Sequence, residues 1–384
     1  MQTLSIEPVR DDKALQEFIT LPWDVYKDDP FWVPPLLSER KTFYDRARHP
    51  FHKHADIEYF VARRDGRAVG TIAAIVNHRH NEFHNERCAF FGSFEVLPDP
   101  EAARALLDAA CDWAKQRGME VLRGPATFSS NEEWGLLVDG FDSAPVILTT
   151  YNPRYFVEYI ETAGFHKAMD LYAYETPSER LTADALPPKL IRAVELIRKR
   201  SNVELRSLDM RRFDEEARHV KRIYNSAWAK NWGFVPLTDE EFDRLASDLK
   251  QVLDPDLTLF ASINGETVGF SIPLPDVSQA LRLAYPNPRT PEWVTLAKLL
   301  WHWKVRPKVD TLRMFALGVL PEYRYAGIDA LFYYESALVG LAKGYRRAEF
   351  SWALESNTMI NRMMTLMGGE IYKTWRIYER PLID

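Results

Sequence analysis

The feature that most constrains the fold is an internal repeat, because motifs of the first half of the chain recur in the same order in the second half. Four pairs of segments correspond: DGRAVGTIAAI (65–75) with NGETVGFSIPL (264–274), GSFEVLPD (92–99) with ALGVLPEY (316–323), NPRYFVEYIETAGFHK (152–167) with NTMINRMMTLMGGEIYK (357–373), and Tyr174-Glu175 with Tyr378-Glu379. One pair could match by accident, whereas four pairs in register indicate two copies of one α/β unit. A length of 384 residues suits two or three domains.

Each copy is expected to follow the order strand, helix, helix, hairpin, strand, helix, strand, helix, strand. Asp65-Gly66 and Asn264-Gly265 lie between apolar segments and predict type I′ hairpin turns. Residues 176–188 hold three prolines and mixed charges, and a basic helix over 190–200 follows them. The predicted division is therefore an N-terminal domain (1–176), a linker with a solvated connecting helix (177–200) and a C-terminal domain (201–384).

A possible ligand site follows the strand expected at Phe315–Val319. Pro321 ends this strand, and Leu331, Tyr334, Leu338 and Leu341 have the spacing of one helix face. The loop between them thus lies at a helix N-terminus, where unpaired N–H groups and the helix dipole favour a phosphate. Gly327 allows close approach of a ligand to the backbone.

The loop sequence Arg-Tyr-Ala-Gly-Ile-Asp (324–329) resembles the pyrophosphate loop of the GNAT acyltransferases, Arg/Gln-x-x-Gly-x-Gly/Ala, which holds acyl-CoA. Arg324 and Gly327 match this pattern, whereas Asp329 departs from it and would repel a pyrophosphate unless it serves the helix N-terminus. The resemblance implies two tandem GNAT-like domains, each a mixed, mostly antiparallel sheet flanked by helices (α/β, or α+β). It also implies acyl-CoA as co-substrate.

Three further segments resemble the bacterial ceramide synthase-like family of double-GNAT proteins: GPATFSSNEEWGLLVDGFD (124–142), NWGFVPLTDEEF (231–242) and YKTWRIYERPL (372–382). This resemblance implies an acyl-CoA-dependent N-acyltransferase that acts on a primary amine, such as a sphingoid-base-like lipid amine. The family is broad, so the acceptor itself does not follow from the resemblance.

The two halves differ at the loop that would hold CoA. In the N-terminal half, Asp99 and Glu101 place two carboxylates where phosphates would lie, and the turn has no glycine. We therefore expect acyl-CoA in the C-terminal half, with Phe315 among the residues that flank the pantetheine. The predicted acyl-CoA-binding residues are Leu317, Gly318, Val319, Arg324, Tyr325, Ala326, Gly327, Ile328, Asp329 and Asn357.

The resemblance also directs attention to acids and bases. Many GNAT enzymes carry a tyrosine acid seven residues after an asparagine, but here Met364 follows Asn357 at that spacing. Tyr159 has the spacing in the N-terminal half, where we expect a core or helix-surface residue. The candidate catalytic bases are Glu355 and Tyr372, and Glu355 could equally cap the helix that begins near Asn357.

The acceptor amine is expected at an insertion, residues 125–151, that has no counterpart in the second half. Such a loop can hold a binding site between the domains, or it can be an ordinary ordered loop. The candidate substrate-binding residues are Asn131, Glu133, Trp134, Tyr151, Asn231 and Trp232.

Composition excludes several classes of protein. A formal net charge of −6 disfavours broad nucleic-acid binding, and two cysteines are too few for a disulfide framework or a cysteine zinc site. His80 and His84 are four residues apart but lack the glutamate of an HExxH motif, so we expect no metal. No segment reaches the roughly 20 apolar residues of a membrane span. The expected location is the cytoplasm, with peripheral membrane contact for a lipid acceptor.

Several alternatives remain open at this point. A small soluble amine could replace the lipid amine, which would make the protein an N-acetyltransferase. A non-catalytic acyl-CoA-binding protein would explain Asp329 and Met364. A peptidoglycan-type double-GNAT transferase that uses aminoacyl-tRNA is disfavoured by the acidic net charge and the absence of a coiled-coil pattern. The oligomeric state is left open.

Overall fold

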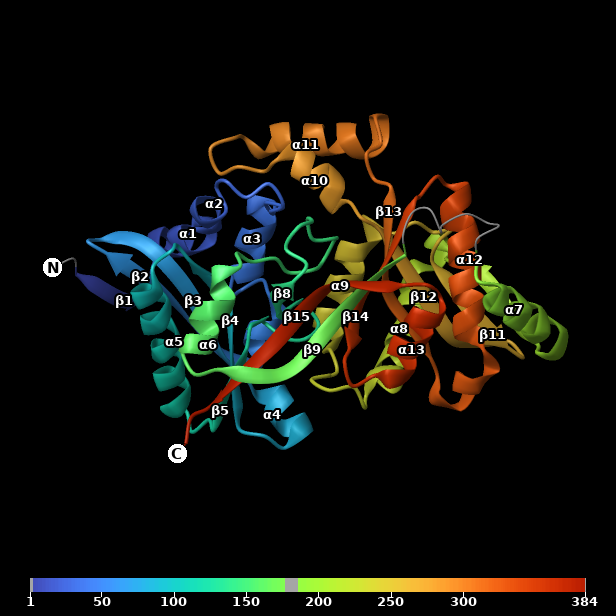
Figure 1. Ribbon diagram of the computed structural model, residues 1–384, viewed down its shortest axis with the longest axis horizontal. Coiled ribbons are helices and arrows are strands. Elements are labelled where there is room, and N and C mark those ends of the chain that lie inside the picture. Colours follow the sequence, from blue (N-terminus) through green and yellow to red (C-terminus); the bar gives the residue numbers. More distant parts are fainter. Residues whose placement is uncertain (1–2, 177–185, 384) are drawn as a thin grey trace. The chain divides into compact units, whose positions relative to one another are not determined.

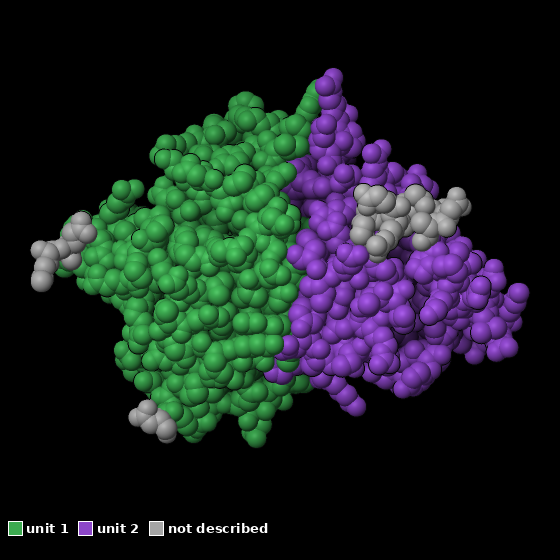
Figure 2. All heavy atoms as spheres, in the orientation of Figure 1, with its two compact units in different colours: residues 1–171, 281–302, 373–384 green, residues 172–280, 303–372 purple. Residues whose placement is uncertain are grey.

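The computed structural model describes residues 3–176 and 186–383, which form two compact units (Figure 2). Unit 1 comprises residues 1–171, 281–302 and 373–384, and unit 2 comprises residues 172–280 and 303–372. Neither unit is one continuous stretch of chain. Residues 177–185 of the predicted linker lie outside the described residues.

Unit 1 is built on a mixed sheet with the order β1-β2-β3-β4-β5-β15 (Figure 1). All neighbouring strands are antiparallel except β4 and β5, which are parallel. The strands are β1 (Leu4–Pro8), β2 (Ala55–Arg64), β3 (Arg67–Asn77), β4 (Cys88–Val96), β5 (Val121–Gly124) and β15 (Glu370–Pro381), of which residues 373–381 belong to this unit. The short strands β6 (Ala126–Thr127), β7 (Glu133–Trp134) and β8 (Leu136–Asp139) and the first part of β9 (His166–Thr176) complete the unit.

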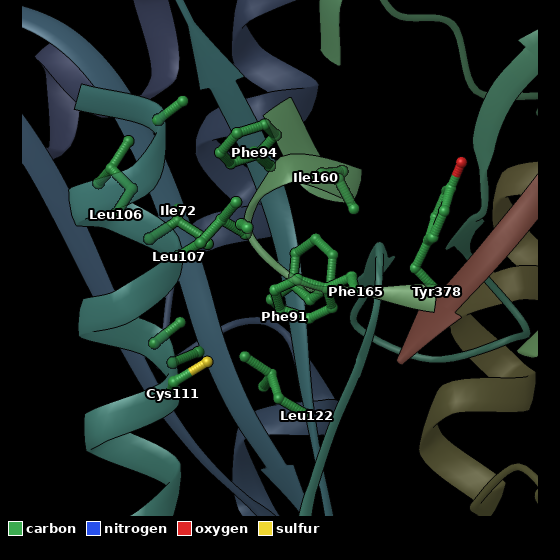
Figure 3. Packing of buried hydrophobic residues seen from close by; sticks show 14 of the residues in the cluster. Ile72, Phe91, Phe94, Leu106, Leu107, Cys111, Leu122, Ile160, Phe165 and Tyr378 are labelled. Carbon is green, nitrogen blue, oxygen red and sulfur yellow. The ribbon is translucent and has the colours of Figure 1, made fainter. Parts of the chain in front are cut away.

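The helices of unit 1 include α5, which packs on one face of the sheet. Figure 3 shows Leu106, Leu107 and Cys111 of this helix gathered with Ile72 and Phe91 of the strands in a buried core. The helices are α1 (Asp12–Thr20), α2 (Pro22–Val25), α3 (Leu37–Tyr44), α4 (His78–His84), α5 (Pro100–Lys115), α6 (Tyr155–Thr162), most of α10 (Ser278–Ala284) and α11 (Glu292–Leu300). The proline-rich segment after α1 thus contains two short helices rather than one long one, as proline requires.

Unit 2 repeats this architecture with the sheet order β14-β13-β12-β11-β10. Here too the neighbouring strands are antiparallel except one pair, β13 and β14. The strands are β10 (Val203–Ser207), β11 (Leu259–Ile263), β12 (Glu266–Pro275), β13 (Thr311–Val319) and β14 (Arg347–Leu354). The predicted order of elements therefore occurs twice, and Asp65-Gly66 and Asn264-Gly265 both have the positive φ angles of type I′ turns.

The helices of unit 2 are α7 (Pro188–Arg200), α8 (Phe213–Trp228), α9 (Asp239–Lys250), α12 (Ile328–Ala342) and α13 (Thr358–Leu366). Our expectation that α7 is a solvated connector is wrong for one of its faces. Leu190 and Val194 are buried against Leu331 of α12, because apolar residues alternate with charged ones at helical spacing. The charged side chains of α7 occupy its other face.

The end of the chain belongs to unit 1. Strand β15 pairs antiparallel with β5, with Tyr378 opposite Gly124 and Pro381 opposite Val121. Trp375 and Ile377 are completely buried there. The boundaries predicted at residues 176 and 201 divide the chain into two continuous halves. Each compact unit instead combines separate stretches of chain, and the domain division stays a prediction. No helix among the described residues is long and apolar enough to cross a membrane.

Candidate functional site

The two parallel strands of unit 2, β13 and β14, pair over part of their length and then separate, and we call this separation a fork. β13 pairs with β14 only from Thr311–Arg347 to Met314–Phe350. Of the following residues of β13, Ala316 to Val319 keep their pairing with β12 on the other side, and Phe315 stands at an irregularity of that pairing. Within the described residues, this part of β13 therefore has a strand partner on one edge only. Unpaired backbone groups of a strand edge can bind an extended ligand that carries amides.

The predicted acyl-CoA-binding residues lie on β13 beyond the end of its pairing with β14 and in the loop that follows β13. Phe315 and Leu317 are partly exposed, whereas Gly318 and Val319 are buried. Beyond β13 a 3-10 helix (Pro321–Ala326) leads to α12, and Gly327 stands at its start with a φ of 75°. This positive φ is the reason for a glycine at this position. The predicted strand, loop and helix are thus in place.

The predicted acyl-CoA-binding residues of the loop differ in how far their side chains are exposed to a ligand. The side chain of Tyr325 is 98% exposed. Arg324 is exposed, and its guanidinium donates a hydrogen bond to the Ala227 carbonyl (2.8 Å). Ile328 is buried in the core, so only its backbone could contact a ligand. Arg324 can therefore turn toward a phosphate at the cost of one surface hydrogen bond.

Asp329, the departure from the family pattern, lies at the first turn of α12. Burial raises the pKa of its carboxyl group, while the backbone N–H groups of Ala330 and of Asp329 itself act in the opposite direction. The carboxyl group thus lies beside backbone N–H groups of the first turn of α12, and its part in acyl-CoA binding stays a prediction.

Helix α7 covers the other side of the loop. A Cβ atom built on Gly327 would lie 2.4 Å from Cδ1 of Ile197. A larger residue at position 327 would therefore disturb the packing of α7 as well as the loop. A substitution of Gly327 is for this reason a poor test of acyl-CoA binding alone.

Below the fork lies a buried carboxyl group that sequence reasoning missed. Glu349 of β14 is 0% exposed and lies opposite Arg313 of β13. Its Oε2 is 3.9 Å from Nε of Arg313, and this guanidinium donates instead to Oγ (3.1 Å) and the carbonyl (3.2 Å) of Ser351. Burial raises the pKa of Glu349 to about 7, although Arg313 acts to lower it. Such a group can exchange a proton near neutral pH.

Tyr372, a predicted catalytic residue, contacts this carboxyl group. Its hydroxyl donates to Oε1 of Glu349 at 3.4 Å, and Arg347 lies over its ring at 5.3 Å. Burial raises the pKa of Tyr372, so the hydroxyl keeps its proton and remains a donor. Because Tyr372 is partly exposed and Glu349 is not, the hydroxyl is the outer member of the pair.

The other predicted residues near α13 have different roles. Asn357 is the N-cap of this helix and accepts a hydrogen bond from the Ile360 N–H (3.2 Å). The alternative that Glu355 caps the helix is therefore wrong. Met364, at the usual position of the acid, is a core residue next to Tyr174. Whether Asn357 binds acyl-CoA and Glu355 acts as a base stay predictions.

In unit 1 the corresponding helix N-terminus is occupied by protein groups. Asp99 caps α5 by accepting from the Ala102 N–H (3.0 Å), and Arg64 donates to both of its oxygens (2.7 and 2.9 Å). The Arg64 guanidinium lowers the pKa of Asp99, and it also pairs with Glu101 (2.9 Å). A charged carboxylate thus stands where the GNAT pattern would place a phosphate, as the sequence suggested.

The fork of unit 1 is filled by the chain itself. β4 pairs with β5 only from Cys88–Val121 to Phe90–Arg123, and residues further along the chain, Ala126 and Thr127, lie beside the next part of β4. The Ser93 N–H donates to Oγ1 of Thr127 (2.8 Å), and a Cβ atom on Gly92 would lie 2.2 Å from the Ala126 carbonyl oxygen. Strand β6 therefore lies beside β4 at the position where β13 has no strand partner among the described residues.

The insertion 125–151 is ordered by polar contacts within unit 1. Glu133 pairs with Arg40 at 2.5 Å, and the Tyr151 hydroxyl donates to both oxygens of Asp29 (3.1 and 2.9 Å). Trp134 is almost completely buried. Glu133, Trp134 and Tyr151 thus belong to one packed region, to which Asn131 is close in sequence. Asn231 and Trp232 belong to unit 2, so a joint acceptor site stays a prediction.

Comparisons with known proteins agree with this architecture. A family model described as the acetyltransferase (GNAT) family matches residues 16–133. A tandem GNAT protein from the clavulanic acid biosynthesis pathway has a TM-score of 0.58 at 14% identity, covering 100% of this chain and 99% of that one. The fold is therefore that of a tandem GNAT protein, two α/β units with mixed sheets and flanking helices, as the sequence predicted.

Two curated relatives narrow the class. The Bacterial ceramide synthase of Caulobacter vibrioides (strain NA1000 / CB15N) is 35% identical and covers 99% of this chain and 98% of its own length. Protein YghO of Escherichia coli (strain K12) is 34% identical over 96% of this chain and 93% of its own length. The chain belongs to the bacterial ceramide synthase-like family of GNAT-fold acyltransferases.

Proposed function

We propose that this protein is an acyl-CoA-dependent N-acyltransferase whose reaction takes place in unit 2. The observation that carries the proposal is the contrast between the two forks. Among the described residues, one edge of β13 has no strand partner past Met314, whereas in unit 1 Ala126 and Thr127 lie at the matching position beside β4. The contrast favours the C-terminal half as the place of the thioester.

In this proposal the pyrophosphate of acyl-CoA binds at the start of α12, near Arg324 and the backbone N–H groups around Gly327. The pantetheine amides pair with the free edge of β13, as an added strand would. Phe315 and Leu317 contact the acyl chain or the pantetheine methyl groups. The binding mode holds the thioester carbonyl in place, and such positioning supplies most of the rate in a two-substrate reaction.

The proton follows a short path. The amine nitrogen attacks the thioester carbonyl, the C–N bond forms, the C–S bond breaks, and CoA leaves as a thiolate. The thiolate takes up one proton from water, and the proton that the amine loses is finally returned to water by Glu349. The excess proton of the amine passes to the Tyr372 hydroxyl, which at the same time gives its own proton to Glu349. Glu349 is suited to this role because its pKa is about 7.

For the acceptor we propose a long-chain amine that carries a lipid tail. The support is the name of the Caulobacter relative, a ceramide synthase, together with the identity over the whole chain. A small soluble amine is the second candidate, since a GNAT fold is shared by enzymes that acetylate such acceptors. An acyl-CoA-binding protein without activity is the third.

The test measures release of free CoA with acyl-CoAs of two to eighteen carbons and two acceptors, sphinganine and spermidine. We expect palmitoyl-CoA with sphinganine to give the highest kcat/KM, because each buried methylene contributes about 0.8 kcal/mol. Acetyl-CoA with spermidine as the best pair would overturn the lipid proposal and leave a small-molecule acetyltransferase. Tight acyl-CoA binding without release from any pair would favour the binding protein.

A further inference from the structure

A cluster of metal-binding atoms lies in unit 1, apart from the proposed reaction in unit 2. The His80 imidazole, the Glu86 carboxylate and the Cys88 thiol have ligand atoms within 4.8 Å of one another. The chain brings them together because α4 ends at His84 and Asn85 turns back with a φ of 52°, so that β4 can begin at Cys88.

The His80 ring provides an independent sign of a missing partner. Its Nε2 is buried and has no hydrogen-bond partner among the described residues, and Oε2 of Glu86 is 3.6 Å away. A buried polar nitrogen without a partner costs free energy, so such atoms usually meet water, an ion or another side chain.

We propose that His80, Glu86 and Cys88 bind a divalent transition-metal ion of the zinc class and tie α4 to the start of β4. Imidazole nitrogen, carboxylate oxygen and thiolate sulfur are the ligands that zinc takes in proteins. Bonds of about 2.0–2.3 Å in a tetrahedron place ligand atoms about 3.3–3.8 Å apart. The widest separation in the cluster, 4.8 Å, would therefore contract by about 1 Å.

The charges of the site are compatible with a dication. Thiolate and carboxylate together supply two negative charges, and the thiol proton is released when the metal binds. Burial raises the pKa of Cys88 to about 12, while the Arg123 guanidinium acts in the opposite direction. Arg123 lies 3.2 Å from Glu86 and 3.1 Å from Glu379, so it retains a counterion when Glu86 turns to the metal.

The fourth coordination position is left to water or to His84. The ring centre of His84 lies 4.4 Å from that of His80, one helical turn away on α4. The spacing of His80 and His84 could be noticed in the sequence. Nothing in the sequence indicated that Glu86, in the following turn, and Cys88, in the next strand, would lie beside them. The expectation of no metal depended on the missing HExxH pattern and on the presence of only two cysteines, whereas this cluster takes one ligand each from a histidine, a glutamate and a cysteine.

The test uses Co²⁺, because a cobalt–thiolate bond gives a charge-transfer band in the near ultraviolet. The full-length protein is first stripped of metal with a chelator and then titrated with Co²⁺ and afterwards with Zn²⁺. We expect one equivalent of Co²⁺ to produce the band and Zn²⁺ to remove it. Cys88→Ser should lose the band, whereas Cys111→Ser, at the buried cysteine of α5, should keep it.

A second variant keeps the test independent of how Cys88→Ser folds. Glu86 is only partly buried, so Glu86→Gln should fold and weaken Co²⁺ binding at least tenfold. Zn²⁺ should also raise the melting temperature of the wild type and leave that of Cys88→Ser unchanged. Absence of the band at saturating Co²⁺, or an equal band in Cys88→Ser, would overturn the proposal.

Discussion

Replacing Glu349 with glutamine tests the proposed proton path most directly. The substitution keeps the size of the side chain and its place below the fork, but it removes the group that accepts the proton from Tyr372. Loss of a general base lowers the rate by about 10²–10⁴-fold. We therefore expect kcat of Glu349→Gln to fall into this range, while KM for acyl-CoA changes little.

The pH profile gives the sharper prediction. With a pKa of about 7, Glu349 is about one-tenth ionised at pH 6 and about nine-tenths ionised at pH 8. The rate of the wild type should thus rise about tenfold over this range, since only the carboxylate accepts a proton. When kcat/KM is expressed per unprotonated amine, the profile of Glu349→Gln should lack this rise, because only the titration of the acceptor amine remains. The measurement is kcat/KM from CoA release at fixed ionic strength.

Stability provides a check that does not depend on activity. The pKa of Glu349 is raised in the folded state from its usual 4.5 to about 7, so the folded state prefers the protonated form. The resulting stabilisation is fully present below pH 4.5 and is lost as the pH rises through 7. Between pH 5 and pH 8 the wild type should lose about 2.5 kcal/mol from this group, and Glu349→Gln should not. Urea unfolding at both pH values measures the difference.

Glu355→Gln is the matched control, because Glu355 is the base that the sequence suggested. We expect it to keep the ascending limb of the profile. Tyr372→Phe should reduce kcat without removing the titration of Glu349, since it interrupts the path and leaves the carboxyl group in place. If Glu349→Gln retains both rate and profile while Glu355→Gln loses them, the proton path proposed for Glu349 is refuted.

Two further substitutions test the loop at α12. Arg324→Glu should weaken acyl-CoA binding at least tenfold in calorimetry without loss of fold, because Arg324 is exposed. The matching Glu101→Arg in unit 1 should leave the affinity for acyl-CoA unchanged. Equal affinities of Arg324→Glu and the wild type would place the pyrophosphate elsewhere. Gly327→Ala should destabilise the protein by about 2 kcal/mol and Gly265→Ala by about 1 kcal/mol. Both glycines have a positive φ, but of the two only Gly327 faces a neighbour, Ile197. Equal losses of unfolding free energy in urea would show that the Ile197 side chain moves freely.

The repeated order of elements could be predicted from the sequence because local signals carried it. Asn264-Gly265 and Asp65-Gly66 fix their turns through residues that tolerate positive φ. The spacing of apolar residues predicted the helix that follows Gly327, but the predicted face was wrong in part, because Leu331 is buried whereas Tyr334, Leu338 and Leu341 are only partly buried. These signals depend on neighbours in the chain, so no knowledge of tertiary contacts was needed.

The compact units could not be predicted in the same way. β15 has the alternating pattern of a half-buried strand, and such a pattern does not name the partner strand. Its pairing with β5 depends on contacts between residues far apart in the sequence. The buried face of α7 could not be predicted for a similar reason. The basic composition of the helix favours exposure to solvent, and the contact of Leu190 and Val194 with α12 joins segments far apart in the sequence.

Glu349 shows why part of the candidate site was missed. Its neighbours in the sequence, Ala348 and Phe350, give it the pattern of an ordinary strand residue. Its raised pKa results from burial, and its partners Arg313 and Tyr372 come from other strands. Tyr372 could be suggested from the family resemblance, but the carboxyl group beside it becomes visible only in the folded chain.

The match of the family model to residues 16–133 and the proposed reaction in unit 2 fit together on physical grounds. A family model follows the residues that form the core, and unit 1 keeps such a core under α5. In the function proposed above, few groups hold acyl-CoA, and in unit 1 Asp99 stands at the corresponding helix N-terminus and Thr127 lies beside β4. A fold can thus stay recognisable while its ligand site is filled by its own chain. We therefore expect equilibrium dialysis with radiolabelled acyl-CoA to give one site per chain, at unit 2.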